Sequence, residues 1–251
     1  MCGQDKPALV LNTAESRVQL VVGTRKKLLF AQQTDVQART MQILPPAIDL
    51  CLKKLGLRPH DLERIAVVRG PGTFTGVRVG LSIALGLARG ADLPMAGLDY
   101  LSLLAQGPAR LMQEKMWVCS YARQNLVNIQ AFSAARKNAF GPAQSMSKEG
   151  AVQAMTADGT GACVFGSGIR WNQSWWSKHL AGMHVLDPIW DNPLPEILLQ
   201  AAWQEQASKA YVLPAYLRPS DAETHLEHIA RERGVDPGVV RETIPDFECR
   251  S

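Results

Sequence analysis

The residues best suited to bind an anion lie in a glycine-rich segment, GPGTFTG (residues 70–76). This segment follows a β-branched run that is typical of a buried strand, and it opens a predicted helix for which Thr73 and Thr75 are candidate N-caps. A glycine-rich turn at the start of a helix directs backbone N–H groups and the positive end of the helix dipole toward one point, which suits phosphate. Because the spacing matches neither GxxxxGKS/T nor GxGxxG, we prefer a structural role, a tight turn with close packing, over anion binding.

Histidine, cysteine and serine patterns offer little further chemistry. His225 and His228 have a spacing that could hold a metal ion, but Glu227 stands between them and no third ligand is evident, so a solvated helix face is preferred. The five cysteines are odd in number and form no CxxC pair, which argues against a disulfide framework and a thiolate zinc site. Hydrolase chemistry stays open, without a GxSxG segment to support it. We predict no metal site.

The helix expected at residues 76–90 carries many small residues at i+4 spacing. They form two stripes, one of Gly76, Gly80, Ala84 and Ala88 and one of Ser82, Gly86 and Gly90. An interior glycine costs about 1 kcal/mol relative to alanine, so several in one helix indicate that another backbone approaches closely. Small or aliphatic residues fill nearly every position from Val77 to Ala88, more than one buried side needs. We predict that this helix contacts a second subunit.

Hydrophobic periodicity indicates a duplicated order of elements. Strands are expected at residues 9–11, 17–22 and 27–31, followed by a helix at 40–55, a strand at 61–68 and the small-residue helix. A short segment at 94–97 and a helix capped by Asp99 come next. A weaker echo has strands at 115–120, 126–132, 142–146 and 162–165 and a helix at 148–155. Two copies of β-β-β-α-β-α predict a two-lobed α/β fold of the actin-like ATPase (ribonuclease H-like) type.

Finer expectations concern the core and the domain boundaries. In the helix at 40–55, core spacing is shown by Ile43, Ala47, Leu50 and Leu55. The tryptophans at 171, 175, 176 and 190 are expected in the core rather than on a ligand platform. Further helices are expected at 195–209, 221–233 and 237–244. We divide the chain into an N-terminal lobe (1–108), a divergent C-terminal lobe (109–213) and a helical tail (214–251).

Several segments resemble one known family. GPGTFTGVR is similar to the GPG(S/T)FTG(L/V)R signature of the TsaB (YeaZ) family, bacterial proteins that work in making threonylcarbamoyladenosine in tRNA. ALVLNTAES (8–16), MQILPPAIDLCLKKLGL (41–57), GLARGADLPMAGLDYLSLLAQG (86–107) and PAYLRP (214–219) resemble further family segments. From residue 111 to 213 the likeness rests mostly on the order of elements. The resemblance also implies the actin-like fold.

The resemblance implies that catalytic acids have been lost. Active members of the superfamily hold hydrated magnesium with a carboxylate on the first strand, and the family's usual Asp falls at Asn12, where a neutral amide is a poor replacement. The family's Asp-Ala-Arg appears as Tyr121-Ala122-Arg123, and a Glu expected shortly after falls at Leu126. If a phosphate group did approach, the residues near it would be Asn12, Thr13, Gly70, Gly72, Thr73 and Thr75.

The family function implied is that of a non-catalytic partner or activator of a TsaD-type transferase, which forms N6-threonylcarbamoyladenosine at position 37 of ANN-decoding tRNAs. Partners implied are that transferase, a TsaE-type ATPase, a second copy of the protein in isolation, and tRNA only through the complex. The chain would have no cofactor of its own, with ATP or ADP at the partner interface left open. The predicted interface residues are Met41, Leu44, Ile48, Gly76, Val79, Gly80, Ile83, Ala84 and Leu87. The alternatives are an independent ATPase, a glycoprotease-like hydrolase, or an RNA-binding module.

Composition is compatible with these interpretations. The 251 residues carry a formal net charge of +4, which permits proximity to RNA, but no long basic run or basic-aromatic interleaving appears. The most apolar run, residues 79–88, is bracketed by Arg78 and Arg89 and is too short to span a bilayer. No N-terminal apolar region resembles a signal peptide. We therefore expect a cytoplasmic protein without membrane contact.

Overall fold

The computed structural model describes residues 5–36, 39–135, 138–157 and 161–218. Residues 1–215 form one compact unit, and residues 216–251 form a second. Two β-sheets build the first unit, one before and one after the predicted boundary at residue 108. The predicted tail helices at 221–233 and 237–244, with His225 and His228, lie outside the described residues.

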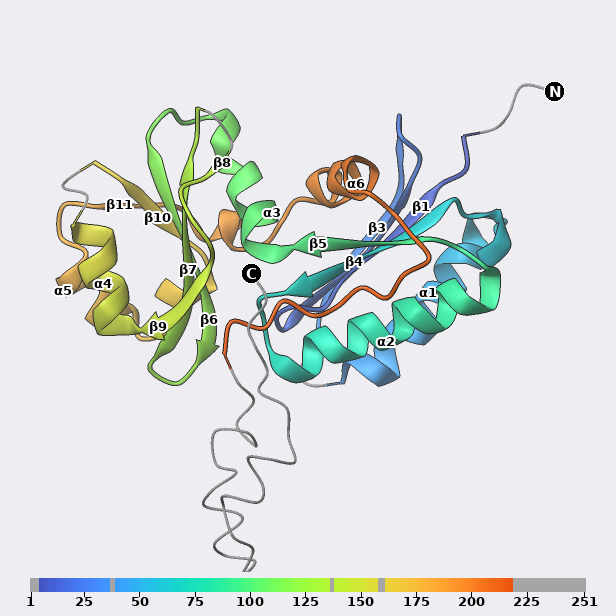
Figure 1. Ribbon diagram of the computed structural model, residues 1–251, viewed down its shortest axis with the longest axis horizontal. Helices are drawn as coiled ribbons and strands as arrows, with labels where there is room; N and C mark the ends of the chain where they lie inside the picture. The colour runs from blue at the N-terminus through green and yellow to red at the C-terminus, as the bar shows by residue number, and fades with distance from the viewer. Residues whose placement is uncertain (1–4, 37–38, 136–137, 158–160, 219–251) are drawn as a thin grey trace, which may run out of the picture. The chain divides into compact units, whose positions relative to one another are not determined.

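The first sheet has the strand order β3-β2-β1-β4-β5 (Figure 1). Its strands are β1 (Ala8–Asn12), β2 (Arg17–Gly23), β3 (Leu28–Asp35), β4 (Arg64–Gly70) and β5 (Met95–Asp99). The first three pair antiparallel, whereas β4 and β5 run parallel to β1. The central strand β1 is buried along its whole length, which explains its continuous apolar run, and the edge strand β3 alternates between half-buried and exposed residues. The strands β1 to β4 were predicted, although the predicted end of β3 came too early, and β5 forms where only a short segment was expected.

Helices cover both faces of this sheet. On one face lie α1 (Thr40–Lys54) and α2 (Phe74–Ala91), with the short 3₁₀ turn η1 (Pro59–Asp61) nearby. On the other lie α3 (Tyr100–Gln106) and α6 (Pro195–Gln204), which returns from the far end of the compact unit to pack on β1 and β2. One core cluster includes residues of both sheets, α3 and α6, so the two lobes share buried apolar surface.

The second sheet repeats the pattern with shorter elements. It has the order β11-β10-β6-β7-β8, and β9 also pairs with β7. Its strands are β6 (Lys115–Arg123), β7 (Leu126–Ser133), β8 (Asn138–Ala139), β9 (Gln144–Ser147), β10 (Cys163–Phe165) and β11 (His184–Val185). The helices are α4 (Lys148–Thr156) and α5 (Gln173–His179), with 3₁₀ turns η2 (Pro108–Arg110), η3 (Ser167–Ile169) and η4 (Pro188–Asp191). The predicted second copy of the element order is confirmed.

Three local predictions are wrong. Leu50 is 53% exposed, because the buried stripe of α1 runs through Leu44, Ile48, Cys51 and Leu52 instead. The helix expected at 195–209 ends at Gln204, because Glu205 adopts an extended conformation. Trp171 is 63% exposed, whereas Trp176 is buried as predicted.

The segment that follows α6 runs along the edge of the first sheet. Ser208 exchanges two backbone hydrogen bonds with Met95 on β5, at 2.7 and 2.9 Å, and the N–H of Ala215 donates to the carbonyl of Arg69 on β4 at 2.8 Å. Residues 205–215, which we call the strap, therefore cover the β5 edge (orange-red in Figure 1). Within the described ranges, no helix is long and apolar enough to cross a membrane.

Candidate functional site

The six residues predicted near a phosphate group gather at the carboxyl ends of β1 and β4, where the loop after β1 meets the start of α2. The Asn12 side chain uses both halves of its amide: Nδ2 donates to Gln19 Oε1 at 2.7 Å, and Oδ1 accepts the N–H of Ala14 at 3.1 Å. The Thr13 hydroxyl donates to the Gly76 carbonyl at 2.8 Å. The N–H of Thr73 donates to the Ala14 carbonyl at 2.7 Å. These residues therefore hydrogen-bond to their own chain.

The glycines of this turn are required by close packing. A Cβ atom at Gly72 would overlap the Ala14 carbonyl group, and one at Gly76 would overlap the carbonyl oxygen of Thr13. Thr73 occupies the N-cap position of α2 but makes no side-chain capping bond, and Thr75 lies inside the helix. The geometry thus favours the structural role that we preferred for this turn over anion binding.

The two stripes of small residues on α2 have opposite environments, which corrects the predicted interface. Gly80 and Ala84 are buried, and a Cβ at Gly80 would overlap the Thr13 hydroxyl, so this stripe packs on the protein's own sheet. Ser82, Gly86 and Gly90 are exposed, and no atom lies within 4 Å of a Cβ built at either glycine. Gly76, Gly80 and Ala84 are consequently internal contacts rather than partner contacts.

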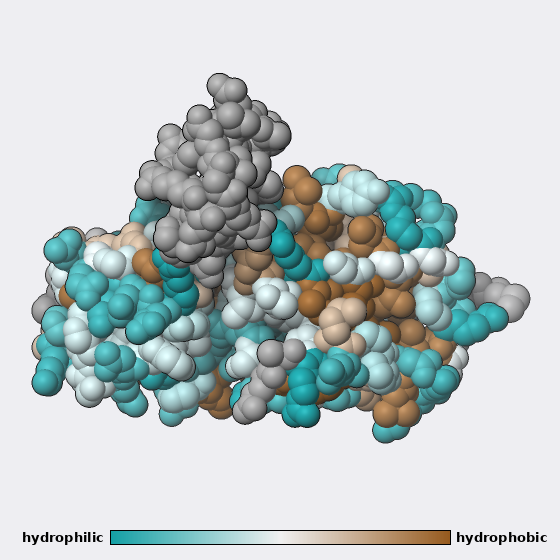
Figure 2. Space-filling view, turned by 90° about the horizontal axis from the view of Figure 1, so that it is seen from below, coloured by the Kyte–Doolittle hydropathy of each residue, from teal (hydrophilic) through white to brown (hydrophobic). Residues whose placement is uncertain are grey.

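The predicted interface residues of α1 divide in the same way. Leu44 and Ile48 are buried at 1% and 3% exposure and face the core cluster under α1 and α2, so assigning them to a partner was wrong. Met41 is 57% exposed. On α2, Val79, Ile83 and Leu87 are half-buried and keep part of their surface in solvent. Figure 2 looks onto this side of the molecule and shows apolar surface gathered there.

We call the corrected surface the α1/α2 face. It consists of the exposed or half-buried residues Met41, Val79, Ser82, Ile83, Gly86, Leu87 and Gly90. Its outermost positions on α2 are bare glycines flanked by aliphatic side chains, which leaves room for a second helix to approach closely.

The two second-lobe positions at which the resemblance placed acids carry no carboxylate. Tyr121 lies on β6 with its ring 5.2 Å from the exposed Trp171 ring, and Leu126 starts β7. Among the residues that the structure describes, no three histidine, cysteine or acidic side chains lie close enough to hold a metal ion.

The sequence analysis missed a cluster of polar side chains between the lobes. Glu15 accepts hydrogen bonds from the hydroxyls of Ser167 and Tyr100, and burial, the largest influence, raises the pKa of its carboxyl group to about 7. Asp191 accepts the N–H of Gly166 at 2.9 Å and pairs with Arg170 at 2.7 Å. The one available signal was an acid directly after the first strand, in the segment NTAES.

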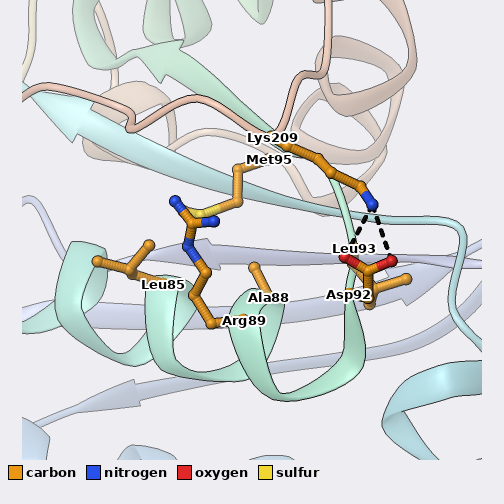
Figure 3. A pocket seen from close by; sticks show the side chains of 7 residues that line it. All are labelled: Leu85, Ala88, Arg89, Asp92, Leu93, Met95 and Lys209. Carbon is orange, nitrogen blue, oxygen red and sulfur yellow. Dashed lines mark hydrogen bonds and ion pairs between the residues drawn. The ribbon is translucent and has the colours of Figure 1, made fainter.

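A small pocket lies between the C-terminal end of α2 and the strap (Figure 3). It is lined by Leu85, Ala88, Arg89, Asp92, Leu93, Met95 and Lys209, and Lys209 Nζ contacts both carboxylate oxygens of Asp92 at 2.7 and 2.8 Å. Its volume of about 20 Å³ is that of a single water molecule, far below the roughly 300 Å³ that small ligands require. We assign it no ligand.

Comparison with known proteins gives consistent matches. A family model described as "TsaD: tRNA N6-adenosine threonylcarbamoyltransferase" matches residues 34–142. The tRNA threonylcarbamoyladenosine biosynthesis protein TsaB of Haemophilus influenzae is 37% identical over 125 residues, which cover 49% of this chain and 52% of that protein. The Escherichia coli TsaB protein is 49% identical over 71 residues, which cover 28% of this chain and 30% of that protein. The alignments thus span about half or less of these relatives.

Solved structures agree on the fold. A Pseudomonas aeruginosa protein, described as similar to peptidase YEAZ, superposes with a TM-score of 0.68 at 22% identity, covering 85% of this chain and all of that one. The predicted two-lobed α/β fold is confirmed, and the YeaZ structures share it. Taken with the GPGTFTGVR segment, these comparisons show that the chain is similar to TsaB/YeaZ proteins over the matched regions.

Proposed function

We propose that this protein takes part in forming N6-threonylcarbamoyladenosine in tRNA, as a non-catalytic partner of a TsaD-type transferase. The names of the curated relatives support the pathway, and the match to the transferase family model supports a partner of related fold. The observation that carries the partner role is the α1/α2 face, where exposed glycines on α2 lie among partly exposed aliphatic side chains.

The physical argument for a binding role is that the exposed glycines and apolar side chains of this face lower the stability of the isolated protein. Gly86 lies inside an 18-residue helix and Gly90 in its last turn, and both are exposed. Among the described residues, nothing outside the local helix lies within 4 Å of a Cβ built at either position, so each glycine weakens the helix by up to about 1 kcal/mol without an internal packing benefit. Half-buried Ile83 and Leu87 beside them leave apolar surface in water. A second helix lying over the glycines would cover them and would bury the apolar surface of Ile83 and Leu87.

The same geometry supports a role without catalysis of its own. Asn12 stands where a magnesium-binding carboxylate would be needed, and both ends of its amide are already hydrogen-bonded. Tyr121 and Leu126 supply no acid in the second lobe. We assign the chemistry to the partner, with tRNA and any TsaE-type ATPase reached through the complex and ATP or ADP held, if at all, at the partner contact. The same face would join two copies of the chain in isolation.

Association with the transferase tests this proposal. Gly86→Leu places a bulky side chain on the α1/α2 face, and overpacking of about 1–3 kcal/mol corresponds to a roughly 5- to 150-fold weaker complex by analytical ultracentrifugation or calorimetry. Gly86→Ala, which adds only a methyl group, and Gly141→Leu, at an exposed glycine of the second lobe, are the matched controls. A folded Gly86→Leu protein that binds the transferase and itself with unchanged affinity would show that the face is not the contact.

A further inference from the structure

The polar cluster between the lobes joins elements that are far apart in the sequence. Glu15, in the loop after β1, accepts the Ser167 hydroxyl from η3 of the second lobe and the Tyr100 hydroxyl from α3, the latter at 3.1 Å. The Ser167 oxygen in turn accepts the N–H of Tyr121 on β6 at 2.9 Å. The Glu15 carboxyl group is thus hydrogen-bonded to residues of both lobes, and it connects the two lobes at this point.

The other end of the same loop is bonded to the first turn of α2. The Thr13 hydroxyl donates to the Gly76 carbonyl at 2.8 Å, and the Ala14 carbonyl accepts the N–H of Thr73 at 2.7 Å. Thr13 is fully buried, and its side chain fills the space that a Cβ of Gly80 would need. Residues 12–15 therefore contact both α2 and the second lobe. A movement of this loop that breaks its contact with the second lobe should also disturb its contacts with α2.

We propose that Glu15 and Ser167 form a latch that keeps the two lobes closed and that, through the loop of residues 12–15, fixes the first turn of α2. Breaking the latch loosens both the second-lobe contacts around Tyr121 and the Thr73 end of α2. The latch is a property of the isolated chain, so it does not depend on any partner.

The groups around Glu15 make the latch sensitive to protonation. Tyr100 on α3, Asp191 in η4 and Cys119 on β6 lie near Glu15, and Asp191 is itself paired with Arg170. Arg17 on β2 acts electrostatically on Tyr100. Burial raises the pKa of the Glu15 carboxyl from 4.5 to about 7, partly offset by the two hydroxyl hydrogen bonds. Opening would return Glu15 to water and lower its pKa, so the closed state holds a proton that the open state releases. Opening therefore becomes easier as the pH rises from about 5 to 8.

Amide hydrogen exchange of the full chain tests the latch, because local opening exposes particular N–H groups. Glu15→Ala removes the acceptor and should raise exchange at Tyr121 and Thr73 about ten-fold or more at pH 8. Glu15→Gln keeps a neutral acceptor and should leave both amides as protected as in the wild type at pH 5, and at least as protected at pH 8. Ser167→Ala should raise exchange at Thr73, a residue that Ser167 does not touch.

Two references keep these outcomes interpretable. Ser177→Ala removes a hydroxyl bonded only within α5, at 2.9 Å to the Gln173 carbonyl, and should change neither amide. The amide of Val10, on the central strand, reports unfolding of the whole unit. A latch requires that Thr73 respond more than Val10. If Ser167→Ala leaves exchange at Thr73 unchanged, the lobes are not coupled to α2 and the latch is wrong. The latch is also wrong if exchange at Thr73 and at Val10 rises equally in every variant.

Discussion

The hydrogen bonds of Asn12 to its neighbours explain why an amide side chain is present at this position. Its amide donates to Gln19 and accepts from Ala14, and Gln19 Nε2 is bonded to the Pro193 carbonyl at 2.8 Å, so the Gln19 amide cannot reverse without losing that bond. A carboxylate at position 12 would place two acceptors opposite each other in a buried site. The amide is therefore the side chain that fits this network.

Asn12→Asp should destabilise the protein and should not create an ATPase. Loss of the donor in a buried network typically costs about 1–3 kcal/mol of unfolding free energy, measured by urea denaturation. Asn125→Asp, at an exposed turn position, is the control and should change stability by less than about 0.5 kcal/mol. Magnesium-dependent ATP turnover by the wild-type protein alone that disappears on Asn12→Ala would contradict the non-catalytic role.

Stability should depend on pH through Glu15. Its carboxyl pKa is about 7 in the folded protein and near 4.5 when unfolded, so the folded state binds more protons between these values and stability falls as the pH rises through that window. The slope is at most about 1.4 kcal/mol per pH unit, and partial exposure of Glu15 keeps it smaller. Glu15→Gln should remove this dependence and raise the urea midpoint relative to wild type more at pH 8 than at pH 5. An equal difference at both pH values would show that Glu15 titrates normally.

At the scale of the element, α2 uses small residues for two separate purposes. The stripe with Gly80 and Ala84 lets the helix lie directly on the loop after β1, where Thr13 occupies the space of a side chain. Over the stripe with Gly86 and Gly90, the described part of the chain places no atom within 4 Å of a Cβ built at either glycine. Only the second stripe is available to a partner.

Substitutions in the two stripes should therefore change stability in opposite directions. Gly80→Ala forces a Cβ into the Thr13 side chain and should lower the free energy of unfolding by about 1–3 kcal/mol. Gly86→Ala, chemically the same change six residues later, should raise it by up to about 1 kcal/mol through helix propensity. Thermal denaturation at low protein concentration measures both. Equal effects would mean that the two glycines have similar surroundings.

At the scale of the whole compact unit, the lobes depend on each other for burial. α6 comes from the far end of the unit, yet Leu198 and Ala202 are fully buried on the face of the first sheet opposite α1 and α2. The core cluster that contains them continues into β6 and β10. The core of the first lobe thus includes α6, which follows the second lobe in the sequence.

A fragment of residues 1–108 should consequently fail to fold alone. Without α6, one face of its sheet would be open to water, and we expect aggregation or no cooperative thermal transition, whereas residues 1–218 should unfold in a single transition. Circular dichroism and light scattering compare the two fragments. A soluble, cooperatively unfolding 1–108 fragment would show that the lobes are independent domains.

Much of the element order, and the likeness to TsaB proteins, could be predicted from the sequence. The apolar run of β1, the β-branched run of β4, the small residues of α2 and the signature GPGTFTGVR are local features. Strand and helix periodicity and turn chemistry are set by neighbours in the chain. The helix at 40–55 was predicted within one residue of α1 for the same reason.

Only the tertiary structure decided which side of each helix faces the core. Periodicity shows that α2 has two sides of small residues. It does not show that Thr13 lies beneath Gly80 or that no described residue packs over Gly86. It likewise could not show that Leu50 points outward, or that Glu15 meets Ser167 across 152 positions of sequence. These contacts depend on how distant segments pack, and a pattern read along one segment holds no information about the element that comes to lie against it.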